Sequence, residues 1–210
     1  MSTLLESAFF KGKAKPQLLF VVLFLFIFAE GAIAQRGAKT LPRNIAQLAE
    51  QSERIVRGRV TRAVVERDPN QKTMWTIVIT LRVEETLKGP AVETLTLRQF
   101  IWDVRDRMDA AGYQKGQHVL LLLNRPTPLG LVSPAGLDQG RFLIRRNAKG
   151  EEEVFNAAGN SGLLRGLDSE LRRRGTRLSP QLAQKISSPS AQALDLREMR
   201  ELLRAFVEPK

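Results

Sequence analysis

The sequence predicts a mainly β protein of the α+β class: a small closed antiparallel barrel with a short N-terminal helix before it and a C-terminal helical appendage after it. Three observations predict this fold. Residues 54–102 hold segments in which apolar and polar residues alternate, as in half-buried strands. Residues 117–124 are a nearly continuous apolar run, typical of a strand buried on both faces. After residue 159 the apolar spacing becomes helical. A barrel removes exposed sheet edges, and an antiparallel β-sandwich is the competing architecture.

The first 34 residues have the pattern of an export signal. A positively charged region precedes an unbroken apolar run over residues 18–29, and residues 32–34 supply the small-x-small triplet that signal peptidase accepts. The run is shorter than the roughly 20 residues needed to span a bilayer. We therefore expect cleavage after Ala34 and a secreted or periplasmic protein that begins at Gln35, with no transmembrane span after cleavage. An uncleaved membrane anchor is the alternative. The positive charge comes from Lys11, Lys13 and Lys15.

The N-terminal part of the mature chain is expected to contain a short helix and the first strand. Residues 44–52 have apolar side chains at helical spacing, and Asn44 is a suitable N-cap. Residues 54–66 hold valines among arginines, and Gly58 predicts a bulge or a close backbone approach there. Residues 68–70 (Asp-Pro-Asn) are a strong turn signal.

Residues 73–86 are the longest expected strand, because they are rich in β-branched residues that alternate in two sets. The set expected to face the core is Trp75, Ile77, Ile79, Leu81 and Val83. The opposite set is Met74, Thr76, Val78, Thr80 and Arg82.

More β segments are expected beyond residue 90, each bounded by turn residues. They are residues 93–102, residues 117–124, and a hairpin of residues 141–146 and 152–155 across the turn at 147–150. Between them, residues 103–115 are charged and irregular. Residues 126–134 are expected to form a loop with a short strand near 129–132.

Three helices are expected at the C-terminus, over residues 162–174, 179–186 and 191–207, the last with Ser190 as its cap. We expect the apolar stripe of the last helix to pack against the barrel or a neighbouring helix, and a partner-binding helix is the alternative. That stripe is Leu196, Met199, Leu203 and Phe206. The chain thus divides into a signal (1–34), a polar lead and short helix (35–53), a barrel domain (54–158) and a helical segment (159–210).

Composition excludes several classes of chemistry. The 210 residues include no cysteine, which excludes disulfides, thiolate zinc sites, thiol nucleophiles and a lipid-modified cysteine. The formal net charge of +11 favours anionic partners. For an exported protein these are lipid head groups, acidic glycans, cell-wall polymers or acidic proteins, and nucleic acid is not expected. A well-solvated basic surface without a specific partner is the alternative.

Two segments carry a resemblance to a known family. Residues 55–60 surround a central glycine and precede a long strand that ends at Lys88-Gly89, and residues 113–123 place Gly116 and polar residues before an aliphatic run. This layout resembles tissue-inhibitor-of-metalloproteinase-like domains of the netrin-module type, including uncharacterised bacterial exported proteins. The resemblance covers about residues 50–146 and implies an OB-fold barrel. The animal inhibitors chelate a protease's zinc through an N-terminal cysteine, so no inhibitory residue carries over to this cysteine-free chain.

Arginines with nearby aromatic residues form the candidate binding surface. Arginine forks onto carboxylates and phosphates, and OB barrels often bind extended ligands across one sheet face. Arg146 is a further arginine of this set, and Tyr113 a further aromatic ring that could supply stacking surface. The candidate ligand-binding residues are Arg98, Phe100, Trp102, Arg105, Arg107, Arg141 and Arg145.

No catalytic residue, metal site or cofactor is predicted. His118 is the only histidine, and its position at the start of an apolar strand favours a structural role. Asp103, Asp106 and Asp109 recur at spacing three, but interleaved arginines favour local ion pairing over a calcium loop. A phosphate-binding loop, a nucleophile elbow and a carboxylate pair are also missing from the sequence.

The interpretation that follows is an exported, non-catalytic binding domain for an anionic envelope component or a protein partner. One alternative is an envelope hydrolase or a hydrolase inhibitor. Another is a scaffold subunit that docks through its C-terminal helix. An enzyme should gather His118 or several carboxylates in a concave pocket, whereas a binding domain should present a contiguous basic or apolar surface.

Overall fold

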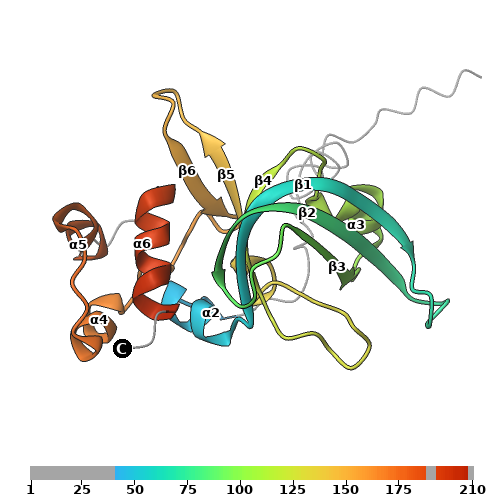
Figure 1. Ribbon diagram of the computed structural model, residues 1–210, viewed down its shortest axis with the longest axis horizontal. Helices are drawn as coiled ribbons and strands as arrows, with labels where there is room; N and C mark the ends of the chain where they lie inside the picture. The colour runs from blue at the N-terminus through green and yellow to red at the C-terminus, as the bar shows by residue number, and fades with distance from the viewer. Residues whose placement is uncertain (1–40, 188–192, 208–210) are drawn as a thin grey trace, which may run out of the picture. The chain divides into compact units, whose positions relative to one another are not determined.

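A seven-stranded sheet, with strands in the order β3-β2-β1-β4-β5-β6-β7, organises residues 41–187 and 193–207, which are the residues that the computed structural model describes (Figure 1). Every pairing between neighbouring strands is antiparallel, so the mainly β, α+β prediction is confirmed. The expected signal, its cleavage site and Ser190 lie outside the described residues. The strands are β1 (Arg54–Arg67), β2 (Trp75–Lys88), β3 (Thr94–Phe100), β4 (His118–Leu123), β5 (Arg141–Arg146), β6 (Glu152–Asn156) and β7 (Leu194–Asp195).

Strands β1 and β2 lie side by side and form an arch (Figure 1). The pair bends because its ladder is interrupted three times. The register shifts between Ile55 and Val56, between Arg57 and Gly58, and between Val60 and Arg62. Such bulges bend a strand pair and increase its twist. The prediction for Gly58 is confirmed, since a Cβ atom there would lie 2.3 Å from the carbonyl oxygen of Arg82.

The inner face of this arch carries one of two apolar clusters. Ile77, Ile79 and Leu81 of β2 are fully buried in it, as the alternation predicts, and they pack with Leu121 of β4. All six residues of β4 are buried, which confirms the strand expected to be covered on both faces. Because side chains alternate along β4, its other face enters the second cluster.

The closed barrel is not confirmed, because the strand order is linear and β3 and β7 are its edges. The expected short strand near 129–132 appears only as single bridges. Val132 donates its amide to the carbonyl of Arg98 on β3, and Leu123 of β4 bridges to Pro134. The segment therefore links the edge strand to β4 without a continuous ladder. Prolines limit its pairing, since Pro126, Pro128 and Pro134 have no amide hydrogen to donate.

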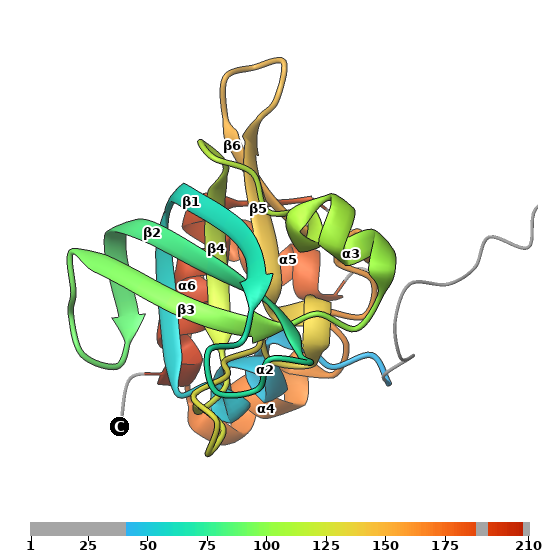
Figure 2. The same ribbon diagram turned by 90° about the vertical axis from the view of Figure 1, so that its right-hand side faces the viewer.

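Helices cover the other face of the sheet around the second cluster, and α2 lies beside α6 (Figures 1 and 2). Asn44 caps α2 with a capping box shared with Gln47, as the N-cap prediction requires. The stripe of the last helix is buried, which confirms its packing role. These helices are α2 (Ile45–Gln51), α4 (Leu167–Arg174), α5 (Pro180–Ser187) and α6 (Leu196–Val207).

Three predicted segments differ from the structure. The helix expected from residue 162 begins only at Leu167, because Gly162 and Gly166 adopt left-handed conformations in the turns before it. The last helix starts at Leu196, because Leu194 and Asp195 pair with β6 as strand β7. The irregular stretch after residue 102 contains a short helix, α3 (Val104–Met108), and a 3₁₀ turn, η1 (Ala110–Gly112); a second 3₁₀ turn, η2 (Leu137–Gly140), precedes β5. No helix within the described ranges combines the length and apolarity needed to cross a membrane.

Candidate functional site

The face of β1, β2 and β3 that turns away from the inner cluster, here called the outer face, is built from four cross-strand rows. Residues paired directly across antiparallel strands share a face, and residues two apart along a strand share it too. The registers of the β1–β2 and β2–β3 ladders therefore define the rows. From one end to the other they are Arg59–Arg82–Thr94, Arg62–Thr80–Thr96, Val64–Val78–Arg98 and Glu66–Thr76–Phe100.

A bulge brings the second arginine of β1 onto this face. Arg59 and Arg62 are three residues apart, so a regular strand would point them to opposite faces. Thr61 is the extra residue of the bulge, and its hydroxyl donates a hydrogen bond to the carbonyl of Thr80 at 3.1 Å. Arg62 consequently pairs with Thr80 and stands on the same side as Arg59 and Arg82.

The first end of the outer face is basic and exposed, and the first row together with Arg62 is here called the basic row. Arg59 lies directly opposite Arg82, and Arg62 lies diagonally from Arg82, all three being exposed. Opposed residues on antiparallel strands have Cβ atoms about 5 Å apart, and diagonal neighbours about 7–8 Å. Arg59 has an ion-pair partner in Glu84, at 3.1 Å. Among the described residues, Arg62 and Arg82 have no carboxylate within ion-pair distance.

The opposite end is aromatic. Arg98 donates to the carboxylate of Glu66 and to the hydroxyl of Thr76, both at 2.7 Å, so its charge is partly neutralised. Phe100 in the last row meets Trp102 edge to face, with ring centroids 4.9 Å apart. Trp102 is 72% exposed, so an apolar ring stands open to solvent just beyond the last row.

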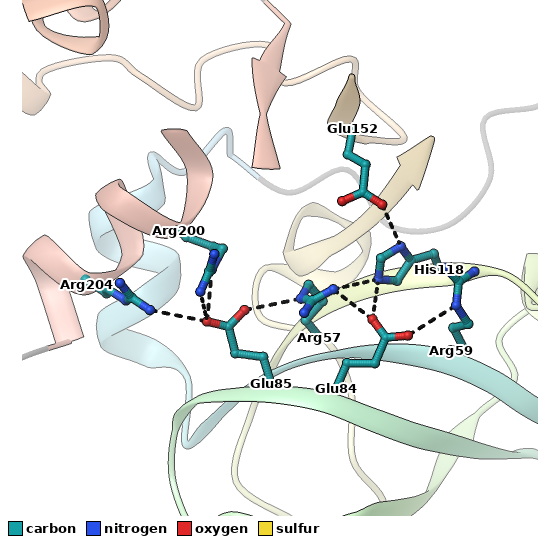
Figure 3. Close-up of polar contacts among 8 residues, drawn as sticks. All are labelled: Arg57, Arg59, Glu84, Glu85, His118, Glu152, Arg200 and Arg204. Carbon is teal, nitrogen blue, oxygen red and sulfur yellow. Dashed lines mark hydrogen bonds and ion pairs between the residues drawn. The ribbon is translucent and has the colours of Figure 1, made fainter. Parts of the chain in front are cut away.

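A charge network borders the basic end where the helices begin to cover the sheet (Figure 3). Glu84 and Glu85 are consecutive, yet both meet Arg57, because a bulge at Glu84 interrupts the alternation of β2. Glu85 also accepts from Arg200 at 2.6 Å and from Arg204 at 3.4 Å, so one carboxylate ties β1 and β2 to α6. The network therefore fixes the C-terminal helix next to the basic row.

His118 occupies the centre of this network (Figure 3). Its Nε2 lies 2.9 Å from Glu84 Oε2 and 3.2 Å from Arg57 Nη1, and its Nδ1 lies 3.7 Å from Glu152 Oε1. A neutral imidazole can serve only one of the two Nε2 partners, by donating to Glu84 or by accepting from Arg57. Burial lowers the pKa of His118, Arg59 and Arg57 lower it further, and Glu84 and Glu152 act against them.

Three of the predicted site residues come together on or beside the outer face. They are Arg98, Phe100 and Trp102. Arg105 and Arg107 follow on α3, where Arg105 pairs at 2.6 Å with Asp103, the N-cap of that helix. The guanidinium of Arg107 lies over the ring of Trp75, 4.4 Å from its centroid. Trp75 packs against the inner cluster, so Arg107 does not belong to the outer face.

The other two predicted residues lie elsewhere in the sheet. Arg141 stacks over Tyr113 at 4.6 Å and donates to the carbonyl of Ala111, which holds the turn η1 in place. Burial raises the pKa of Tyr113 to about 12, so this ring stays neutral in the core. Arg145 lies over Phe155 at 4.8 Å, on the hairpin of β5 and β6.

The sequence reasoning did not select the basic row. The alternation of β2 did place Arg82 in the set opposite the core, together with Thr76 and Thr80, so this signal was available. Arg62 could not be assigned in the same way, because the bulge at Thr61 leaves no mark in the sequence. Its side chain joins Arg59 only through the register of the folded pair.

No group of three or more histidine, aspartate or glutamate side chains within the described part of the chain is placed to hold a metal ion. Comparison with protein-family models, with curated proteins and with solved structures finds no match to this chain.

Proposed function

We propose that this protein is an exported, non-catalytic binding domain that holds an anionic component of the cell envelope on its outer face. The observation that carries the proposal is the direct opposition of Arg59 and Arg82, with Arg62 on the diagonal. Like charges directly opposite each other destabilise a sheet. An anion bound across these side chains removes that repulsion and gains charge-assisted hydrogen bonds, which are the stronger kind.

The placement of the row also supports binding. Three strands present it on an exposed surface, and the network of Glu84, Glu85 and His118 anchors one border. Side chains on rigid strands lose less freedom on binding than side chains on loops. Arg62 and Arg82 have no carboxylate partner among the described residues, so a ligand need not break an ion pair to reach them.

We further propose that the arch is an OB-like barrel. In support, β1, β2 and β3 form a meander, β4 returns to pair with β1, and the bridges at Arg98 and Pro134 link the edge strand to β4. The arch also encloses its own apolar cluster. Export is proposed from the charged, apolar and small-residue pattern of the first 34 residues. Mass spectrometry of the exported protein should give a chain that begins at Gln35.

Binding assays with anionic polymers test the function. The probes are polyphosphate, polygalacturonate and vesicles that contain anionic phospholipid, presented to the wild type and to the double variant Arg62→Ala/Arg82→Ala. We expect at least one polymer to bind, and the double variant to bind it at least about tenfold more weakly, since charged hydrogen bonds contribute roughly 1.5–3 kcal/mol each.

The matched control is Arg172→Ala/Arg177→Ala, which removes the same charge from exposed positions at and beyond the end of α4. If both double variants weaken binding equally, net charge alone attracts the polymer. The outer face would then not be a site.

A further inference from the structure

We infer that the anionic ligand is an acidic polysaccharide whose chain lies along the outer face, from the basic row to Trp102. This inference rests on the proposed function and specifies its ligand. The two ends of the outer face differ. One end carries Arg59, Arg62 and Arg82, and the other end carries Phe100 and the exposed Trp102. A ligand that uses both ends must offer anionic groups and apolar surface in one extended molecule.

The length of the face suits an oligomer. Successive rows are two residues apart on β2 and β3, and an antiparallel strand rises about 3.4 Å per residue, so the first and last rows are about 20 Å apart along these strands. Trp102 stands just beyond the last row, beside Phe100. A single small anion can contact only the basic row and does not reach Trp102. Only a chain of several linked units contacts the arginines and the indole together.

The side chains between the two ends match the surface of a sugar chain. Thr80 and Thr96 place their hydroxyls 3.2 Å apart in the second row, and Thr94 adds another hydroxyl in the first row. Such groups both donate and accept hydrogen bonds, as sugar hydroxyls do. A sugar ring also has an apolar C–H face, which can cover an exposed aromatic ring such as that of Trp102.

Other polyanions match only part of this arrangement. Polyphosphate has charge for the arginines but no apolar surface for Trp102. An anionic bilayer would attract the arginines, yet stable interfacial binding needs a broad apolar face that enters the membrane. The outer face instead presents short threonines and a single row of valines, Val64 and Val78, of which Val78 is buried. The arrangement therefore fits the polysaccharide best.

The test compares two polyanions on one pair of variants, with the full protein immobilised. Polygalacturonate and polyphosphate are titrated against the wild type, Trp102→Ala and Trp102→Tyr. We expect Trp102→Ala to weaken polygalacturonate binding about three- to tenfold, the range of a specific aromatic contact, and to leave polyphosphate binding unchanged. Trp102→Tyr should recover most of the affinity. Met108→Ala, which removes another exposed apolar side chain, is the matched control and should have no effect.

Two further measurements complete the test. The galacturonic acid monomer should bind at least about tenfold more weakly than its polymer, because it cannot reach both ends. The chain has two tryptophans, so polygalacturonate should change the emission of the wild type, whereas polyphosphate should not. This fluorescence readout uses no variant and stands even if Trp102→Ala fails to fold.

The two proposals fail in different ways. If Arg62→Ala/Arg82→Ala binds every polyanion as the wild type does, the proposed function is wrong. If the arginines are needed but Trp102→Ala affects neither polymer, or affects both equally, the polysaccharide inference is overturned while anion binding stands. Binding to anionic vesicles that exceeds binding to polygalacturonate would also overturn it.

Discussion

Arg59 on β1 and Arg82 on β2 are direct cross-strand partners in the antiparallel ladder. Arg59 has an ion-pair partner in Glu84 at 3.1 Å, a carboxylate that it shares with Arg57, whereas within the described residues Arg82 has no carboxylate partner. The sheet therefore carries an opposed pair of like charges on an exposed part of its surface. The pair should therefore affect stability and anion binding in opposite directions.

Arg82→Thr should raise stability and lower affinity together. We expect the free energy of unfolding to rise by about 0.2–1 kcal/mol, the range of a cross-strand pair, because the repulsion with Arg59 disappears. Urea unfolding measures the first effect and polyanion titration the second. Arg62→Thr is the control for strand propensity, since Thr80 and not an arginine lies opposite that position. A loss of stability in Arg82→Thr would contradict the assigned repulsion.

Glu85→Gln should loosen the C-terminal helix. The carboxylate accepts from Arg57, Arg200 and Arg204, and its side chain is only 14% exposed. Neutralising it leaves Arg200 and Arg204 without a carboxylate partner among the described residues, while Arg57 keeps Glu84. We expect a loss of about 1–3 kcal/mol, which is less than for a fully buried pair because the arginines remain partly exposed.

Glu53→Gln is the control for that change, because its pair with Arg125 is exposed and should contribute less than about 1 kcal/mol. Urea unfolding compares the two variants, and hydrogen exchange of α6 should accelerate in Glu85→Gln alone. Equal stability of the two variants would show that Glu85 does not hold the helix.

His118 should make the protein less stable in mild acid. Burial holds its pKa in the folded state below the ordinary value of about 6.5, so the unfolded chain takes up a proton first. The stability contribution is complete above about pH 6.5 and is lost as the pH falls from there towards the lower folded-state pKa. The groups that face the ring are Glu84, Glu152, Arg57 and Arg59.

His118→Gln isolates this effect, because the difference between wild type and variant cancels the other titrating groups. The wild type should lose more stability than the variant between pH 7.5 and pH 5.5 in urea unfolding. A wild type that gains stability relative to the variant over this interval would mean that Glu84 and Glu152 outweigh burial and raise the pKa instead.

Local patterns were enough to predict much of the fold. Asn44 and Gln47 form their capping box within one turn of chain, and five of the six residues of β4, residues 119–123, are apolar wherever they are placed. Long-range pairing decided what the patterns could not show. Asp195 looks helical by spacing, yet it pairs with Glu153 of β6, and its carboxylate then accepts from the amide of Glu198 to begin α6. Closure of the sheet depends likewise on contacts between distant segments.

The candidate site residues also separate into those that local patterns could group and those that depend on long-range pairing. Arg98, Phe100 and Trp102 lie within five residues, so the sequence could group them. Arg141 was predicted to meet a ligand but lies over Tyr113, a partner 28 residues away that no local pattern indicates. Arg62 and Arg82 share the outer face only because a bulge shifts the register of β1.

Gly58→Ala tests whether the close approach of β1 and β2 at Gly58 sets the register that arranges this surface. An added Cβ would lie 2.3 Å from the carbonyl oxygen of Arg82, a backbone atom that cannot rotate away. The strands must therefore move apart next to the bulge at Glu84, and we expect a loss of about 3 kcal/mol in urea unfolding. Gly150→Ala is the control. Its backbone has φ of +81° but open space around it, so it should lose only about 1–2 kcal/mol.

Gly58→Ala also tests whether the register at Gly58 affects polyanion binding as well as stability. If the close approach at Gly58 sets the register, the folded variant should also bind polyanion more weakly, because Arg59 and Arg82 no longer stand opposite each other. Binding is measured at a temperature where both glycine variants remain folded. The alternative outcome is an unchanged affinity, together with a loss in free energy of unfolding no larger than that of Gly150→Ala. It would mean that the bulges form independently of Gly58 and that the packing of the inner face fixes the register of the basic row.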